Sequence, residues 1–170
     1  MRRLFGTSVL CIVLFVSGGC GGDDAAPPDS DLSDSQDGGD AGQGTAVPDC
    51  PFTEDQVTDL LGQPMTDQDN CLFGDGKGVA SLTVTTASET AGAATFDTSR
   101  ESAEGRYDSI EDLDVDGSGY VAVGELGGEA VAITKAGSFT LTMSSFERLD
   151  PAGYDESLRS LVDAALESAS

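Results

Sequence analysis

The chain has 170 residues, of which 31 are acidic and 8 are basic, giving a formal net charge of -23. Because proteins bind nucleic acids by neutralising phosphates with Lys and Arg, this charge excludes nucleic acid as a natural partner. The sequence contains no His, which excludes His-based catalytic triads and His-ligated zinc sites.

Residues 1–19 have the layout of a secretory signal peptide. Arginines at positions 2 and 3 precede an apolar run over 4–16, which is too short to cross a bilayer as a helix. An N-terminal anchor that stays uncleaved is the alternative interpretation, but the small residues at 17–19 favour cleavage. The sequence therefore predicts export.

Ser17-Gly18-Gly19-Cys20 resembles the lipobox of bacterial lipoproteins. The resemblance implies that Cys20 becomes the first residue of the mature chain and carries a diacylglycerol together with an N-linked acyl chain such as palmitate. Two or more acyl chains give stable anchoring where one is marginal. We therefore expect a protein of the cell envelope that is lipid-anchored to the cell membrane, with its domain on the extracytoplasmic side.

Residues 20–49 are expected to form the lipidated Cys and a tether rich in Asp and Gly. The stretch 21–49 contains eight aspartates, no basic residue and only two large aliphatic residues, Leu32 and Val47. Such a segment cannot bury enough apolar area to offset the entropy that ordering would cost, so we expect it to be disordered.

Cysteine pairing follows from the predicted processing. Cys11 leaves with the signal peptide and Cys20 is acylated, which leaves Cys50 and Cys71 as a pair. In an exported protein such a pair indicates a disulfide. A metal pair and a redox pair are the alternatives, but this pair has neither the C-x-x-C spacing nor the His neighbour of such sites. The predicted bridge closes a loop of about 20 residues.

The domain at 50–170 begins with a helix signal. Thr53 suits the N-cap, Gln56 stands three residues later as in a capping box, and Gly62 followed by Pro64 ends the pattern. Residue Val57 belongs to the apolar face of this helix.

The next element is an alternating strand over 79–86. One face carries Ala80, Leu82 and Val84, and the other carries Ser81, Thr83 and Thr85. Further along the chain, the pattern predicts a hairpin of 71–73 with 79–86, a helix over 89–104, a hairpin of 130–135 with 139–146, and a helix over 154–167. The predicted class is α+β, a small antiparallel sheet covered by helices.

Three short motifs resemble an uncharacterised domain family of small exported lipoproteins, best known from actinobacteria. They are Cys50-Pro51-Phe52-Thr53, the helix ending Leu60-Leu61-Gly62, and Cys71-Leu72-Phe73. The segment 124–130 is similar to the glycine motif that precedes a late strand in that family. The resemblance implies the α+β fold and the disulfide, and it implies no activity.

Residues 114–125, DVDGSGYVAVGE, match a calcium-binding EF-hand loop in part. The ligand positions would be taken by Asp114, Asp116, Ser118, the Tyr120 carbonyl and Glu125. The following Leu-Gly-Gly does not suit the exiting helix that orients the last ligand, and residues 120–123 suit a strand. We therefore predict a turn and strand without tight calcium binding, and keep a calcium-binding or calcium-stabilised module as the alternative function.

The sequence contains no G-x-S-x-G elbow, S-x-x-K motif or phosphate-binding loop. We therefore expect a non-enzymatic binding or interaction domain that needs no cofactor, with Ca²⁺ as the alternative. Its expected partners are the membrane, through the lipid anchor, and a protein or small molecule that the sequence does not identify.

Overall fold

The computed structural model describes residues 46–146 and 149–170. The predicted signal peptide at 1–19, Cys20 and the tether up to residue 45 lie outside the described residues. The helices and strands that follow belong to one compact unit.

The first helix, α1 (Glu54–Leu61), forms for the local reasons that the sequence indicates. The Thr53 amide donates to Gln56 Oε1 over 2.8 Å, and the Gln56 amide donates to Thr53 Oγ1 over 3.4 Å, so the capping box is present. Gly62 takes a left-handed conformation with φ 63° and ends the helix. Val57 is fully buried and directs the helix onto the core.

Seven strands form one antiparallel sheet in the order β1-β2-β3-β7-β6-β5-β4. Their bounds are β1 Thr66–Asp67, β2 Leu72–Gly74, β3 Ser81–Ala87, β4 Ser109–Asp112, β5 Gly117–Gly124, β6 Gly127–Thr134 and β7 Gly137–Ser144. Both predicted hairpins are present, as β2–β3 and β6–β7. The edge strands β1 and β4 were not predicted, because each is short and β4 contains a single apolar residue, Ile110.

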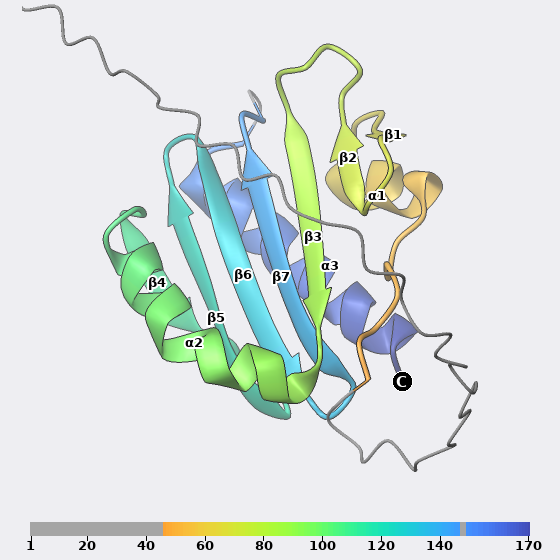
Figure 1. Cartoon of the computed structure of the whole chain (residues 1–170). Coiled ribbons are helices and arrows are strands. Elements are labelled where there is room, and N and C mark those ends of the chain that lie inside the picture. Colours follow the sequence, from red (N-terminus) through yellow and green to blue (C-terminus); the bar gives the residue numbers. More distant parts are fainter. Residues whose placement is uncertain (1–45, 147–148) are drawn as a thin grey trace, which may run out of the picture. The chain divides into compact units, whose positions relative to one another are not determined.

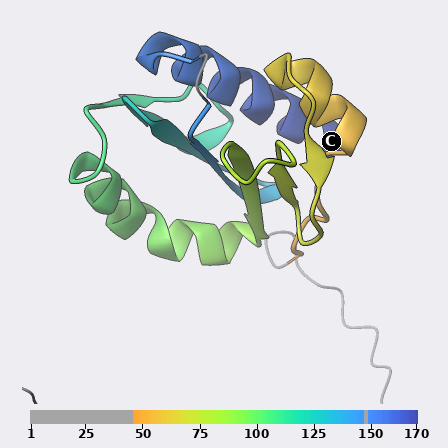
Figure 2. The ribbon, with the colours of Figure 1, turned by 90° about the horizontal axis from the view of Figure 1, so that it is seen from above.

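Helices cover both faces of the sheet. Figure 1 shows α2 (Glu89–Glu104) in front of the sheet and α3 (Pro151–Ser168) behind it, and Figure 2 shows α1 beside α3 in the second helical layer. The predicted α+β class is therefore confirmed. The last helix starts three residues earlier than predicted, because Asp150 caps it by accepting the Gly153 amide at 2.8 Å.

Two hydrophobic cores lie on the two sides of the sheet. The larger core joins the sheet to α1 and α3 and contains Leu158 and Leu161, both fully buried. Truncation of such a leucine to Ala costs about 2–5 kcal/mol. The smaller core lies under α2 and contains Ala103, Tyr120, Ala122, Val131 and Ile133.

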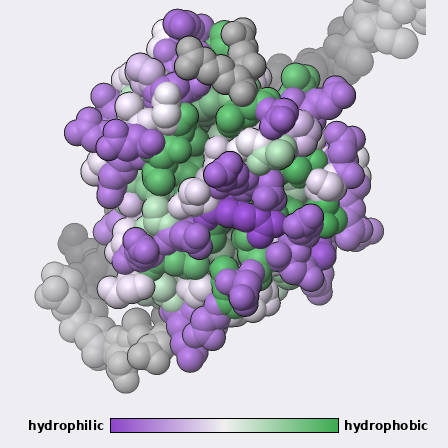
Figure 3. Space-filling view, turned by 180° about the vertical axis from the view of Figure 1, so that it is seen from behind, coloured by the Kyte–Doolittle hydropathy of each residue, from purple (hydrophilic) through white to green (hydrophobic). Residues whose placement is uncertain are grey.

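The outer surface of the α3 layer is mixed in character. Figure 3 shows hydrophobic patches on this face that are separated and bordered by hydrophilic side chains. Arg159 of α3 pairs with Asp155 at 2.8 Å and with Glu111 of β4 at 3.0 Å, which ties the helix to the sheet edge. Among the described helices, none combines the length and the apolar character needed to cross a membrane.

Candidate functional site

The predicted disulfide is present. Cys50 and Cys71 are bonded, with Cα atoms 5.6 Å apart, and the bridge joins the segment before α1 to the residue that precedes β2. Cys71 has a left-handed φ of 59°, which a residue with a side chain rarely adopts. The bridge therefore fixes the entry into the β2–β3 hairpin and is a structural feature. The other predicted modification site, Cys20, lies outside the described residues.

The structure does not bring the five candidate calcium ligands together. Asp114 and Asp116 precede β5, whereas Glu125 follows it in the two-residue turn to β6. An eight-residue strand spans roughly 26 Å, so the two ends of the segment are far apart. Within the described ranges, no group of three or more Asp, Glu, Cys or His residues is arranged to hold a metal ion.

The two remaining candidate calcium ligands, Ser118 and Tyr120, lie inside β5 itself. Ser118 is exposed near the start of the strand, and Tyr120 is fully buried under α2. The predicted turn and strand at 114–125 is thus the observed structure.

A different surface gathers polar side chains on neighbouring strands. On the α2 side of the sheet, β3 and β7 carry six hydroxyl residues, which we name the hydroxyl face: Ser81, Thr83, Thr85, Thr140, Thr142 and Ser144. The register pairs Ser81 with Ser144, Thr83 with Thr142, and Thr85 with Thr140. Opposite side chains in such pairs lie about 5 Å apart, and successive ones along a strand about 7 Å apart, so the hydroxyls form a regular grid.

Most of these hydroxyls have no internal partner. Ser81 and Ser144 share a hydrogen bond of 2.9 Å between their Oγ atoms. Across the part of the chain that the structure describes, the four threonine hydroxyls make no hydrogen bond to another protein group. Thr83 and Thr85 are exposed, and Thr140 and Thr142 are half-buried. The four groups are therefore open to water or to a ligand.

Helix α2 forms one border of the hydroxyl face. In Figure 1 it crosses the sheet obliquely from the end of β3 toward β4, so no described helix lies in front of the upper parts of β3 and β7. Gly92 rests directly on Ser138 of β7, where an added Cβ would lie 2.4 Å from the serine Cβ. This close approach ends the open surface at the first turn of α2.

The opposite end of the hydroxyl face opens into a shallow hollow of about 630 Å³. Thr142 and Ser144 line it together with the α2–β4 loop and the β5–β6 turn, which contribute Arg106, Tyr107, Asp108, Glu125 and Leu126. Gly124 lies close to the α2–β4 loop, since a Cβ at this position would be 3.4 Å from Asp108 Oδ2 and 3.7 Å from Tyr107 Cδ1. The hollow is therefore continuous with the hydroxyl face.

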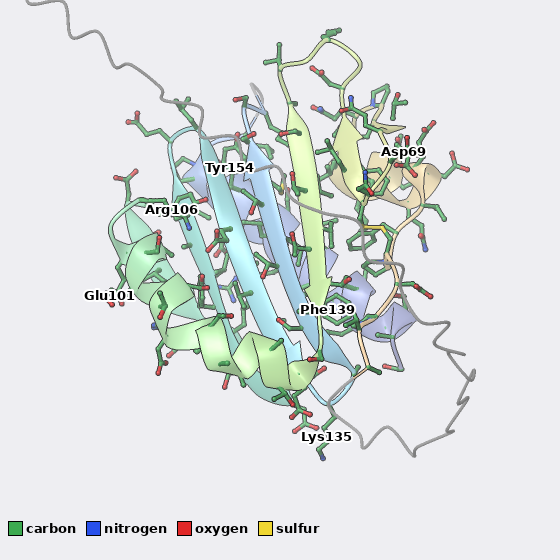
Figure 4. The ribbon with its side chains drawn as sticks, viewed as in Figure 1. Asp69, Glu101, Arg106, Lys135, Phe139 and Tyr154 are labelled. Carbon is green, nitrogen blue, oxygen red and sulfur yellow. A yellow bond between two sulfur atoms is a disulfide. The ribbon has the colours of Figure 1, made fainter. Side chains whose placement is uncertain are left out.

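An ion pair between the half-exposed Arg106 and the buried Glu129 holds the wall of this hollow. Glu129 of β6 is only 6% exposed, and its Oε2 lies 2.9 Å from Arg106 Nη2. Tyr120 Oη donates to the other oxygen, Oε1, over 2.7 Å. Both carboxylate oxygens are thus engaged by donors, which fixes the loop after α2 against the sheet. Figure 4 shows Arg106 at the end of α2, beside the sheet.

The same contacts set the protonation behaviour of this cluster. Burial, followed by the hydrogen bond to Glu129, raises the pKa of the Tyr120 phenol. The hydrogen bond to Glu129 raises the pKa of Arg106. The guanidinium also lies over the Tyr107 ring, 5.2 Å from its centroid, and burial raises the pKa of Tyr107. The cluster therefore acts as a support.

The hydroxyl face was not recognised as a site from the sequence. The alternation in 79–86 separates Ser81, Thr83 and Thr85 from the apolar face, and β7 repeats the pattern as TLTMS over 140–144. Each of the two segments shows the alternation of hydroxyl and apolar residues, but only the pairing of β3 with β7 joins their hydroxyl residues into one surface.

In comparisons with protein-family models, curated proteins and solved structures, nothing matches this chain. The resemblance to exported lipoproteins therefore stays an expectation from short sequence motifs.

Proposed function

We propose that this chain is an exported, lipid-anchored protein of the cell envelope whose domain binds a partner without catalysis through the hydroxyl face. The observation that carries the proposal is the set of four threonine hydroxyls that lie in one plane of the sheet and make no hydrogen bond to another described residue. Hydroxyls that make no internal hydrogen bond are left to water, so an open grid of them suits recognition of a ligand with matching donors and acceptors.

Binding is favoured over catalysis by the surroundings of Thr142. A threonine hydroxyl becomes a nucleophile only beside a general base. Its register partner on β6 is Glu129, but that carboxylate already accepts from Arg106 and Tyr120. With no His in the chain, the commonest general base is missing as well.

Anchoring at Cys20 completes the proposal. The signal layout of residues 1–19, the lipobox-like tetrapeptide and the acidic tether support a domain held outside the membrane on a lipid anchor. Labelling with a fatty-acid analogue tests the anchor directly. Wild type should incorporate the label and a Cys20→Ser variant should not; equal incorporation would show that the anchor lies elsewhere.

Site-specific photo-crosslinking in intact membranes tests the binding surface. A photoreactive residue at Thr83 should crosslink to an envelope component, because this side chain is exposed and lies on the hydroxyl face. The matched control is Ser160, an exposed residue of α3 in the opposite helical layer. Crosslinking of equal strength at both positions, or at Ser160 alone, would contradict the proposal.

A further inference from the structure

The hydroxyl face is uncharged in a chain that is otherwise strongly acidic. Its six residues are Ser and Thr only, whereas the chain has 31 acidic residues and a formal net charge of -23. The nearest carboxylate across the register, Glu129, is paired with Arg106. Anionic ligands are repelled by the net charge, and cationic ligands are drawn to the acidic surface elsewhere. The electrostatics therefore favour an uncharged ligand on this face.

The border of the hydroxyl face beside β2 adds a hydrogen-bonding group without adding charge. Gln68 lies against Gly74, where an added Cβ would be 2.3 Å from Gln68 Nε2. Gly74 is the register partner of Ser81, so the Gln68 amide extends the grid by one position. On the other side, the half-buried Tyr107 lines the hollow next to Thr142 and Ser144, where the charged side chains belong to the loops and not to the face itself.

The chemistry of the grid also separates a glycan from a peptide. A peptide gains most of its affinity for a sheet by adding to an edge strand with its backbone. β7 is paired with β3 on one side and β6 on the other, so its backbone groups are taken. What the face offers is side-chain hydroxyls, each of which donates once and accepts twice. Those groups match a ligand that itself carries many hydroxyls.

The shape of the surface fits a single extended chain. The grid extends over three cross-strand rows, from Thr85–Thr140 to Ser81–Ser144, and the first turn of α2 closes it at the Thr85–Thr140 end. Three rows at about 7 Å span roughly 14 Å from first to last. A surface two strands wide and closed at one end by α2 accepts a short stretch of a single ligand chain.

We propose that the hydroxyl face binds a neutral glycan chain, with Thr83 and Thr142 as central contacts. This inference rests on the proposed binding function and names the class of ligand for the same surface. The glycan contacts the hydroxyl grid by exchange of hydrogen bonds with the threonines, and its uncharged character makes binding insensitive to salt.

Binding of oligosaccharides to the full-length protein in detergent micelles tests the inference. The probes are neutral chito-, cello- and manno-oligosaccharides. Deacetylated chito-oligosaccharides serve as the cationic control and oligogalacturonate as the acidic control. At least one neutral probe should bind with an affinity that does not change between low and high salt. The cationic probe should lose affinity as salt rises, because screening weakens its attraction to the acidic surface.

Two variants assign the neutral binding to the face. Thr83→Val with Thr142→Val removes two hydroxyls at nearly constant shape and should weaken binding about tenfold or more, as expected when hydrogen bonds worth about 1.4 kcal/mol are lost. Thr86→Val is the matched control, because Thr86 lies on the same strand but points to the opposite face. It should leave the affinity unchanged.

Failure to bind every neutral probe overturns the inference, and so does neutral binding that the double variant does not weaken. If no neutral probe binds but crosslinking at Thr83 in membranes captures a protein or lipid, the assignment of a glycan ligand is wrong, whereas the proposal that the hydroxyl face binds a partner is retained. If crosslinking at Thr83 fails too, the proposed function is wrong with it.

Discussion

Thr83 and Thr142 face each other across the β3–β7 register, and in the described part of the chain neither hydroxyl is hydrogen-bonded to the protein. Both strands lie inside the sheet, where backbone hydrogen bonds hold their positions. The two hydroxyls are therefore presented on a rigid support, and a ligand that reaches them displaces only water.

Replacement of these two threonines should hardly affect folding. Thr83→Val with Thr142→Val keeps the β-branched shape that suits a strand and breaks no hydrogen bond to another described residue. We expect the free energy of unfolding to change by less than about 0.5 kcal/mol, as for substitutions away from structural features. Urea denaturation of the non-reduced protein measures it. A loss of several kcal/mol would reveal an internal partner for these hydroxyls.

Removal of the buried Tyr120 hydroxyl, unlike removal of the threonine hydroxyls, should destabilise the protein. Tyr120→Phe removes the 2.7 Å hydrogen bond to Glu129 and leaves a buried carboxylate oxygen without its donor. The expected cost is about 1–3 kcal/mol of unfolding free energy. Tyr107→Phe is the control, since this ring is only half-buried and its hydroxyl makes no hydrogen bond to another described group. Equal effects of the two variants would show that the buried contact contributes nothing.

All three tyrosines of the chain should resist ionisation in the folded state. Burial is the main cause that raises the pKa of Tyr107, Tyr120 and Tyr154 above the unfolded value of about 10. A raised pKa in the folded state means that the corresponding stability is fully present below about pH 10 and is lost as the pH rises through the folded values.

Ultraviolet absorbance of tyrosinate measures this titration. At pH 10 the native protein should show less ionisation than the protein unfolded in urea, in which about half of the tyrosines should be ionised. Ionisation of all three tyrosines near pH 10 in the native protein would contradict the burial of these rings.

Reduction of the disulfide should destabilise the domain. The bridge joins residues 21 apart in the sequence, and the chain-entropy model gives about 3 kcal/mol for a loop of this size. Thiol counting in denaturant without reductant should find neither Cys50 nor Cys71 reactive. A Cys50→Ala and Cys71→Ala double variant should unfold at a lower urea concentration. Unchanged stability in that variant would show that the bridge does not constrain the unfolded chain.

The sequence predicted the elements whose signals are local. The capping box at Thr53 and Gln56 and the alternation in 79–86 depend on neighbours within a few residues, and both appear in the structure. Strand β4 was missed, because only its pairing with β5 at the sheet edge makes Ser109–Asp112 a strand.

The candidate site was missed for a similar reason. Its two halves, in β3 and β7, are more than 50 residues apart, and their pairing depends on the whole sheet. The contact between Arg106 and Glu129 is equally non-local, since it joins a loop after α2 to the middle of β6. In contrast, the EF-hand match was a local sequence similarity. In the structure, β5 separates the first candidate ligands, before the strand, from the last one, after it.

Threonine-methyl NMR of the full-length protein, titrated with the neutral oligosaccharide that binds best, shows directly whether the ligand lies on the hydroxyl face. The methyl signals of Thr83, Thr85, Thr140 and Thr142 should shift together, because these side chains form that face. The signal of Thr98, exposed on α2, should stay in place. Shifts at Thr98 without shifts at the four threonines of the face would contradict the claim.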